Sequence, residues 1–240
     1  MPGSVKTPAI VLRSIRYGEA DRVLHLFTPG HGRMGAIAKG VRRARSRFGG
    51  RLEPFFRLEL VLYQGRGELL TVTSAETVCA HPRLREHHGS LDAAARACDA
   101  VSRMFDSEDA NPAVYHLLAN QLALLDAAPQ SAGPANQLAF RLKLLLAAGL
   151  APQLEACASC GDREHLSGFS GAAGGVVCSA CEASAFALEA DAHTFLVEAL
   201  GRPLAGTPAA SARALTQAER AIRETLEYHA NVRLRPAAAA

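Results

Sequence analysis

The spacing of the apolar residues changes once along the chain, and this change limits the folds that the chain can adopt. Between residues 6 and 80, apolar and polar residues alternate in five short runs, separated by turn residues such as Gly18, Pro29-Gly30 and Gly65-Arg66-Gly67. From residue 90 onward, apolar residues recur at helical spacing. The sequence therefore predicts an α+β protein, with an N-terminal β-domain followed by an α-helical domain.

The first five runs fit a small closed barrel. Their connections are short except for the one between the third and fourth runs, where the most basic segment of the chain lies. Five short strands with one long connection are typical of an OB-fold barrel, although an SH3-like barrel fits the same pattern. We expect Met34, Ala36 and Ala38 to share one face of the third strand.

The helical part contains recognisable start signals. Ser90 is a candidate N-cap for a helix with an apolar stripe, Asn111-Pro112 can start a second helix, and Gly133-Pro134 a third. Two more helices are expected over residues 191–200 and 211–234. The chain contains 6 cysteines, and we expect two of them, Cys79 and Cys98, to be thiols of the core.

The other four cysteines form the motif C-x2-C-x17-C-x2-C, made by Cys157, Cys160, Cys178 and Cys181. Each C-x2-C turn can direct two thiolates at one ion, and two such turns complete a tetrahedral zinc site. Gly161 suits the tight turn after the first pair. Because four thiolates fill the coordination shell, we expect a structural zinc ion; a redox dithiol or an iron–sulfur cluster is the alternative, and His165 could replace one cysteine.

The positive charge of the chain is concentrated near its N-terminus. Residues 1–80 carry 13 Lys and Arg against 6 Asp and Glu, whereas residues 81–240 carry 13 against 17. The candidate nucleic-acid-binding residues in the long connection are Lys39, Arg42, Arg43, Arg45 and Arg47. Phe48, Tyr17 and Phe27 are candidates for stacking on bases, with core packing favoured for Phe27. The alternative is a solvated basic loop without a ligand.

The N-terminal segment resembles that of the bacterial RecO family of DNA repair proteins. The matching positions are Arg13, Tyr17-Gly18-Glu19, Asp21-Arg22, Phe27-Thr28, Gly32, Ala38-Lys39-Gly40, Arg42, Ser46, Leu52 and Pro54-Phe55. The segment LKLLLAAGLAPQLEACASCG resembles the helix that leads into the cysteine cluster of the family. Glu53 departs from the family pattern, in which we expect an uncharged polar residue.

The resemblance implies a recombination mediator rather than an enzyme. Such a protein binds single-stranded and double-stranded DNA, anneals complementary strands, and acts with RecR to load RecA onto strands coated by the single-stranded DNA-binding protein SSB. We expect Arg13, Arg22 and Arg51 to extend the basic DNA-binding surface. The resemblance also implies that the helical domain binds the acidic SSB tail, for which Arg141 and Lys143 are candidates.

Several other functional classes fit the sequence less well. The chain has no G-x-x-x-x-G-K-[ST] loop for ATP, and a catalytic zinc would need a coordination position that four cysteines fill. The main alternative is a structural zinc-ribbon adaptor that binds RNA. We expect no membrane segment, because the longest apolar run, from Leu144 to Ala151, is far shorter than the roughly 20 residues needed. A cytoplasmic, nucleoid-associated protein is expected.

These patterns together predict the domain boundaries. The predicted parts are an OB-fold barrel (1–81), the first part of the helical domain (82–156), the zinc motif (157–181), the second part of the helical domain (182–236) and a frayed tail (237–240).

Overall fold

The computed structural model describes residues 3–43, 45–65, 67, 69–181 and 185–237. The chain forms two compact units, Met1–Ala127 and Ala128–Ala240, which are described separately below. Among the described residues, no helix is both long enough and apolar enough to cross a membrane.

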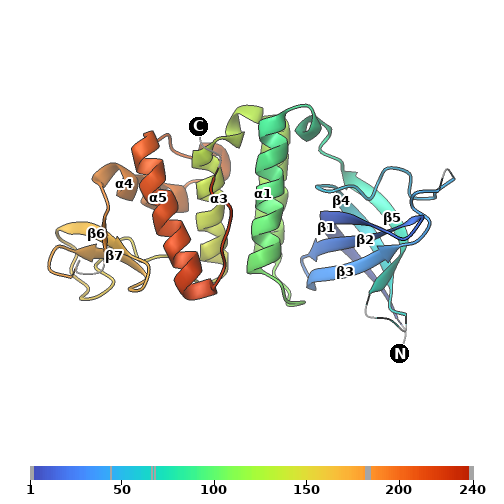
Figure 1. The fold of residues 1–240 in the computed structure, drawn as a ribbon, viewed down its shortest axis with the longest axis horizontal. Helices are drawn as coiled ribbons and strands as arrows, with labels where there is room; N and C mark the ends of the chain where they lie inside the picture. The colour runs from blue at the N-terminus through green and yellow to red at the C-terminus, as the bar shows by residue number, and fades with distance from the viewer. Residues whose placement is uncertain (1–2, 44, 66, 68, 182–184, 238–240) are drawn as a thin grey trace. The chain divides into compact units, whose positions relative to one another are not determined.

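The first unit begins with a closed five-stranded barrel (Figure 1). Its strands are β1 (Ser4–Tyr17), β2 (Asp21–Thr28), β3 (Gly32–Ala38), β4 (Arg57–Tyr63) and β5 (Leu70–Cys79). They pair in the order β1-β2-β3-β5-β4, and β5 closes the barrel by pairing parallel to β3 and antiparallel to β4. The predicted OB-like barrel is confirmed. Of the predicted turn at residues 65–67, Arg66 lies outside the described residues.

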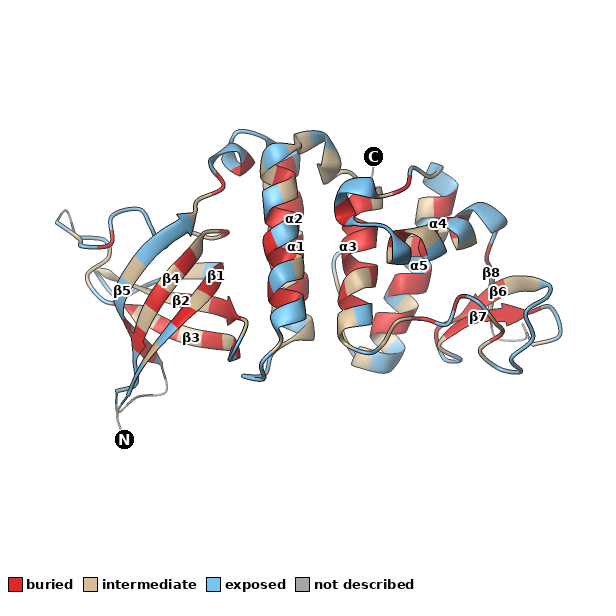
Figure 2. Ribbon diagram, turned by 180° about the vertical axis from the view of Figure 1, so that it is seen from behind, coloured by how far each residue is buried: buried red, intermediate tan, exposed pale blue. Residues whose placement is uncertain are grey.

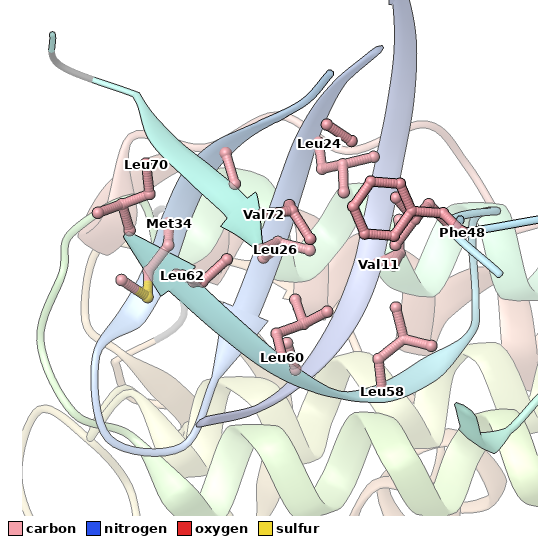
Figure 3. Close-up of a cluster of buried hydrophobic side chains, with 14 residues drawn as sticks. Val11, Leu24, Leu26, Met34, Phe48, Leu58, Leu60, Leu62, Leu70 and Val72 are labelled. Carbon is pink, nitrogen blue, oxygen red and sulfur yellow. The ribbon is translucent and has the colours of Figure 1, made fainter. Parts of the chain in front are cut away.

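The barrel core follows from the alternation of the strands (Figure 2). Met34, Ala36 and Ala38 are buried on one face of β3, as the sequence predicts. Leu24 and Leu26 of β2 and Leu58, Leu60 and Leu62 of β4 enter the same core. The β3–β4 connection contributes Phe48 and Leu52 to it, and Figure 3 shows the Phe48 ring among these aliphatic side chains.

Two helices complete the first unit: α1 (His88–Met104) and α2 (Pro112–Ala127). The predicted start of α2 is confirmed, because Asn111 Oδ1 accepts a hydrogen bond from the Val114 N–H at 3.0 Å. The predicted N-cap of α1 is wrong. This helix begins two residues before Ser90, with His87 in extended conformation as its N-cap, and Ser90 is buried in the first turn.

The β2–β3 hairpin of the barrel packs closely on these helices. Phe27 contacts Phe105 edge-to-face, with 6.4 Å between ring centroids. The Arg33 N–H donates to the Ser107 carbonyl at 3.0 Å, and its guanidinium donates to the Ser102 carbonyl at 3.1 Å. Only glycine fits at position 32, because its φ is +51° and a Cβ there would lie 2.4 Å from the Asp109 carbonyl oxygen.

The second unit combines helices with a small sheet. Its helices are α3 (Pro134–Ala147), α4 (Ala190–Gly201) and α5 (Ala212–Thr225), and its sheet has the order β7-β6-β8, with β6 (Leu166–Ser170), β7 (Gly175–Cys178) and β8 (Phe186–Ala187). The start of α3 is as predicted.

The last predicted helix is too long. A π-helical turn (Leu226–Ala230) follows α5, and Asn231 ends it in left-handed conformation, with φ +52°. Of the predicted frayed tail, Ala237 is buried and its N–H donates to Glu219, while residues 238–240 lie outside the described residues.

The predicted and observed divisions of the chain differ in the helical part. The barrel ends at Cys79, close to the predicted boundary at residue 81. Helices α1 and α2, however, belong to the same compact unit as the barrel.

Candidate metal centre and nucleic-acid surface

The four motif cysteines lie together in the second unit. Their sulfur atoms are all within 4.8 Å of one another, and Cys160 Sγ lies 3.7 Å from Cys178 Sγ. A tetrahedral zinc site with Zn–S bonds of about 2.3 Å has S–S edges of about 3.8 Å. The donor set therefore fits one metal ion with four sulfur ligands.

Backbone turns place the thiols in this arrangement. In the first turn, the Gly161 N–H donates to the Cys157 carbonyl at 2.8 Å, with Gly161 at φ +80°. In the second turn, the Cys181 N–H donates to the Cys178 carbonyl at 2.9 Å. The first turn is joined to β7, which leads into the second turn, by a hydrogen bond from the Ala158 N–H to the Val176 carbonyl at 2.8 Å. Gly175 allows β7 to approach Gln153 closely, since a Cβ there would lie 2.2 Å from the Gln153 carbonyl oxygen. The tight turn expected at Gly161 is confirmed.

The thiols differ in their acidity. Hydrogen bonds from backbone N–H groups, first that of Cys178, lower the pKa of Cys157 to about 6. Hydrogen bonds with the thiols of Cys178 and Cys160 raise the pKa of Cys181 to about 12. The group of possible ligands does not include His165, which is exposed and offers its carbonyl to the Ser179 N–H.

In the basic loop (residues 39–48), residues 39–42 and 47–48 form turns. The Gly40 N–H donates to Asp21 Oδ1 at 2.7 Å, and the Arg42 N–H donates to the Ala20 carbonyl at 2.9 Å. At the other end, Phe48 is only 2% exposed and Leu52 1%. The loop is therefore attached to the barrel at both ends, and its five cationic residues, Lys39, Arg42, Arg43, Arg45 and Arg47, are all exposed.

Two of the predicted DNA-binding residues have other roles in the structure. Phe48 cannot offer its face to a base, because its ring is in the barrel core and Arg47 lies over it at 4.8 Å from the centroid. Arg22 forms an ion pair with Glu53, with Nη1 3.0 Å from Oε1, and donates to Ser14 Oγ. Glu53, the residue that departs from the family pattern, thus neutralises one predicted contact.

The remaining predicted cations are accessible to different degrees. Arg13 is exposed on β1, and Arg51 is exposed three residues after the basic loop. The Arg51 guanidinium donates to the Arg47 carbonyl at 3.4 Å, and that of Arg47 donates to the Val72 carbonyl at 3.4 Å. Arg42, Arg43 and Arg45 have no side-chain hydrogen bond or ion pair among those found in the described residues.

The two candidate residues for the SSB tail are engaged inside the second unit. Arg141 is buried, pairs with Glu219 at 3.3 Å and donates to the Arg235 carbonyl at 2.6 Å. Lys143 donates to the Leu200 carbonyl at 2.9 Å, and burial lowers its pKa. Neither side chain is a freely exposed cation of the kind that the sequence suggests.

The sequence analysis missed a cavity in the second unit. It has a volume of about 500 Å³, and its lining includes Arg220, Arg223, Ile222, Leu226 and Leu234. The C-terminal residues that form one wall were expected to be helical, so the cavity could not be anticipated. The i, i+3 spacing of Arg220 and Arg223 on α5 is the one signal that places two cations on one helical face.

The fold and the sites define a class of protein: an OB-like barrel followed by helices that carry a four-cysteine motif able to hold a metal ion. Residues 1–80 match the family model "Recombination protein O N terminal", and residues 90–236 match "Recombination protein O C terminal". The chain therefore belongs to the RecO family, and its role is in recombinational DNA repair.

Curated relatives agree with this assignment. A DNA repair protein RecO of Rubrobacter xylanophilus is 38% identical over 228 residues, which are 93% of this chain and 90% of that protein. The RecO protein of Myxococcus xanthus is 36% identical over 72% of this chain and 70% of its own length. That of Bifidobacterium longum is 38% identical over 71% of each chain.

Proposed function

We propose that this protein is a recombination mediator. In this role it binds single-stranded and double-stranded DNA, anneals complementary strands without a catalytic step, and works with RecR to load RecA onto SSB-coated strands. The observation that carries the proposal is the basic loop, in which five exposed cations occur without an acidic residue between positions 39 and 48. Family membership supports DNA over RNA as the ligand. A DNA ligand would place the protein at the nucleoid.

Annealing requires only that two polyanions be held close together. Cations of the basic loop would bind the phosphates of one strand and reduce its repulsion of the second. Arg13 and Arg51 extend this surface in our proposal, whereas Arg22 and Phe48 do not belong to it, given their contacts with Glu53 and with the core. Because the loop is already attached to the barrel, little conformational entropy need be lost when DNA binds.

The central experiment is annealing of complementary oligonucleotides coated with cognate SSB, without nucleotide. Wild-type protein should anneal them, and Arg42/Arg43/Arg45→Ala should lose this activity while keeping its thermal melting temperature. Arg47 is left in place because it contacts Phe48 and Val72. Annealing that survives in the variant would place the DNA surface elsewhere. A wild type that anneals nothing but binds RNA would favour the RNA-binding adaptor.

We infer that the four cysteines hold a structural zinc ion. When bound, zinc would join the two C-x2-C turns through four thiolates and leave no position for water. Structural zinc can contribute about 10–16 kcal/mol of apparent binding free energy at neutral pH, so removing it should unfold the second unit before the barrel. Metal analysis should give one zinc and no iron per chain, and cobalt substitution should give the absorption bands of a tetrathiolate site. Iron in place of zinc would contradict the assignment.

We further propose that the SSB tail binds at the cavity beside α5. Its lining combines Arg141, Arg220 and Arg223 with the apolar Ile222, Leu226 and Leu234. Arg141 pairs with Glu219 and Arg220 with Glu224, so we assign the acidic part of the tail to the exposed Arg223 and its apolar end to the three aliphatic residues. Arg223→Ala should weaken binding of a labelled SSB-tail peptide, measured by anisotropy, whereas Arg83→Ala, a change in the first unit, should not. Equal affinities for the two variants would remove the tail from this cavity.

A further inference from the structure

The outer face of the barrel carries an apolar strip across β1, β2 and β3. Residues directly opposite in an antiparallel ladder share a face, and Ile15 pairs with Val23, which pairs with Ile37. Tyr17 lies two residues along β1 on the same face. Ile15 is 37% exposed and Tyr17 59% exposed, while Val23 and Ile37 are half-buried. We call these four residues the outer strip.

Helix α1 covers only one end of this face. Phe27, which follows Val23 and His25 along the same face of β2, is 0% exposed and packs on Phe105 at the end of α1. Beyond this contact the face carries His25 and Arg13, and after them the aliphatic residues of the outer strip and the exposed Tyr17. The outer strip is thus a continuation of a packing surface whose far end is open.

Two ionisable pairs flank the outer strip along the β1–β2 ladder: Arg13 and His25 at one end, and Asp21 opposite Tyr17 at the other. Arg13 pairs with His25 across β1 and β2, next to the Ile15–Val23 pair. Burial lowers the pKa of His25, and the charges of Arg33 and Arg13 lower it further, so both shift the ring toward its neutral form. Leu69, 39% exposed, extends the apolar surface over Gly35, where a Cβ would lie 2.8 Å from its Cδ2.

The outer strip adjoins the basic loop. Tyr17 pairs with Asp21, whose carboxylate accepts the Gly40 N–H. In the turn between Tyr17 and Asp21, the Ala20 carbonyl accepts a hydrogen bond from the Arg42 N–H. The first cations of the loop therefore begin directly beside the exposed end of the strip.

We propose that the outer strip holds unpaired bases of a single-stranded DNA whose phosphates lie on the basic loop, with Tyr17 as the residue on which a base stacks. The proposal rests on the DNA-binding function proposed above. A single strand offers apolar base faces and phosphates side by side, and proteins bind it with stacking side chains next to cationic groups. A duplex has its bases already stacked on one another, so it can use the loop but not the strip. When the bound strand pairs with its complement, its bases would leave the outer strip.

The sequence permits a direct optical test, because the chain contains no tryptophan. Tyr17→Trp places a single reporter in the strip of the full-length protein, and Tyr228→Trp places one at a tyrosine of similar exposure, 66%, in the second unit. Titration with a dT oligonucleotide should quench the emission at position 17 and leave that at position 228 unchanged. A blunt duplex that binds equally well should quench neither.

Affinity measurements provide the second test. Tyr17→Ala should weaken binding of the dT oligonucleotide by about tenfold, the scale of a lost stacking contact, and should leave duplex binding unchanged. Tyr17→Phe should keep wild-type affinity, because it retains the ring, and Tyr228→Ala is the matched control. The base-stacking proposal would be overturned if Tyr17→Ala bound both the duplex and the dT oligonucleotide with wild-type affinity and if DNA did not quench the Tyr17→Trp variant. DNA binding by the loop would then remain intact. Failure of the wild type to bind either DNA would overturn both.

Discussion

Replacing Arg42, Arg43 and Arg45 by alanine should reduce the salt dependence of single-stranded DNA binding by a defined amount. These are the loop arginines without a side-chain partner among the described interactions. Each phosphate neutralised on a single strand contributes about 0.7 to the slope of log affinity against log salt concentration, so three lost contacts should make the slope less negative by about 2.1. When the salt concentration rises fourfold, both proteins lose affinity for DNA. The factor by which the variant loses affinity should be about twentyfold smaller than the factor for the wild type.

Anisotropy of a labelled dT oligonucleotide, titrated at four salt concentrations, measures this slope. The control variant is Arg83/Arg213/Arg233→Ala, which removes the same charge from exposed positions outside the loop. Its slope should equal that of the wild type. If both variants change the slope equally, only the net charge matters and the loop is not a localised site. If the loop variant keeps the wild-type slope, its arginines do not contact phosphates.

Three further changes test particular contacts. Gly32→Ala should lower the free energy of unfolding, measured in urea, by about 1–3 kcal/mol, whereas Gly30→Ala, where a Cβ meets nothing within 4 Å, should change it little. Burial raises the pKa of Cys98 to about 12, so peptide mapping after alkylation at pH 8 should find Cys98 unmodified in the native protein and modified in urea; native modification would contradict its burial. Glu53→Gln frees Arg22 and should make the salt slope for DNA more negative by about 0.7, while a constant slope would show that Arg22 does not reach the phosphates.

The sequence predicts the barrel well because its evidence is local. Alternating apolar residues, short turns and one long connection can be read over a few residues each, and the structure confirms them. The C-x2-C turns are equally local, and the spacing of the cysteines contains the information that brings the four thiols together. A group of metal-binding side chains that is encoded in a short motif can therefore be predicted even where the fold around it cannot.

The contacts that the sequence does not reveal join distant parts of the chain. Phe48 follows a run of arginines and was expected to be accessible, but the barrel core accommodates its ring. Arg22 and Glu53 are separated by 31 positions, so their ion pair leaves no periodic signal. Arg141 belongs to an apolar helix in sequence, and only the fold brings Glu219 and the Arg235 carbonyl to it.

The burial of Phe48 also explains how a segment with five like charges can remain folded on the barrel. Repulsion among exposed cations is screened within about 10 Å at 0.1 M salt, whereas burying a Phe or Leu side chain stabilises by about 1.5–3 kcal/mol. Phe48 and Leu52, together with the hydrogen bonds of Gly40 and Arg42, thus outweigh the repulsion and hold the cations on the surface. Phe48, which cannot stack on a base, therefore positions the charges that DNA would meet, and in our proposal base stacking is assigned to Tyr17 at the end of β1.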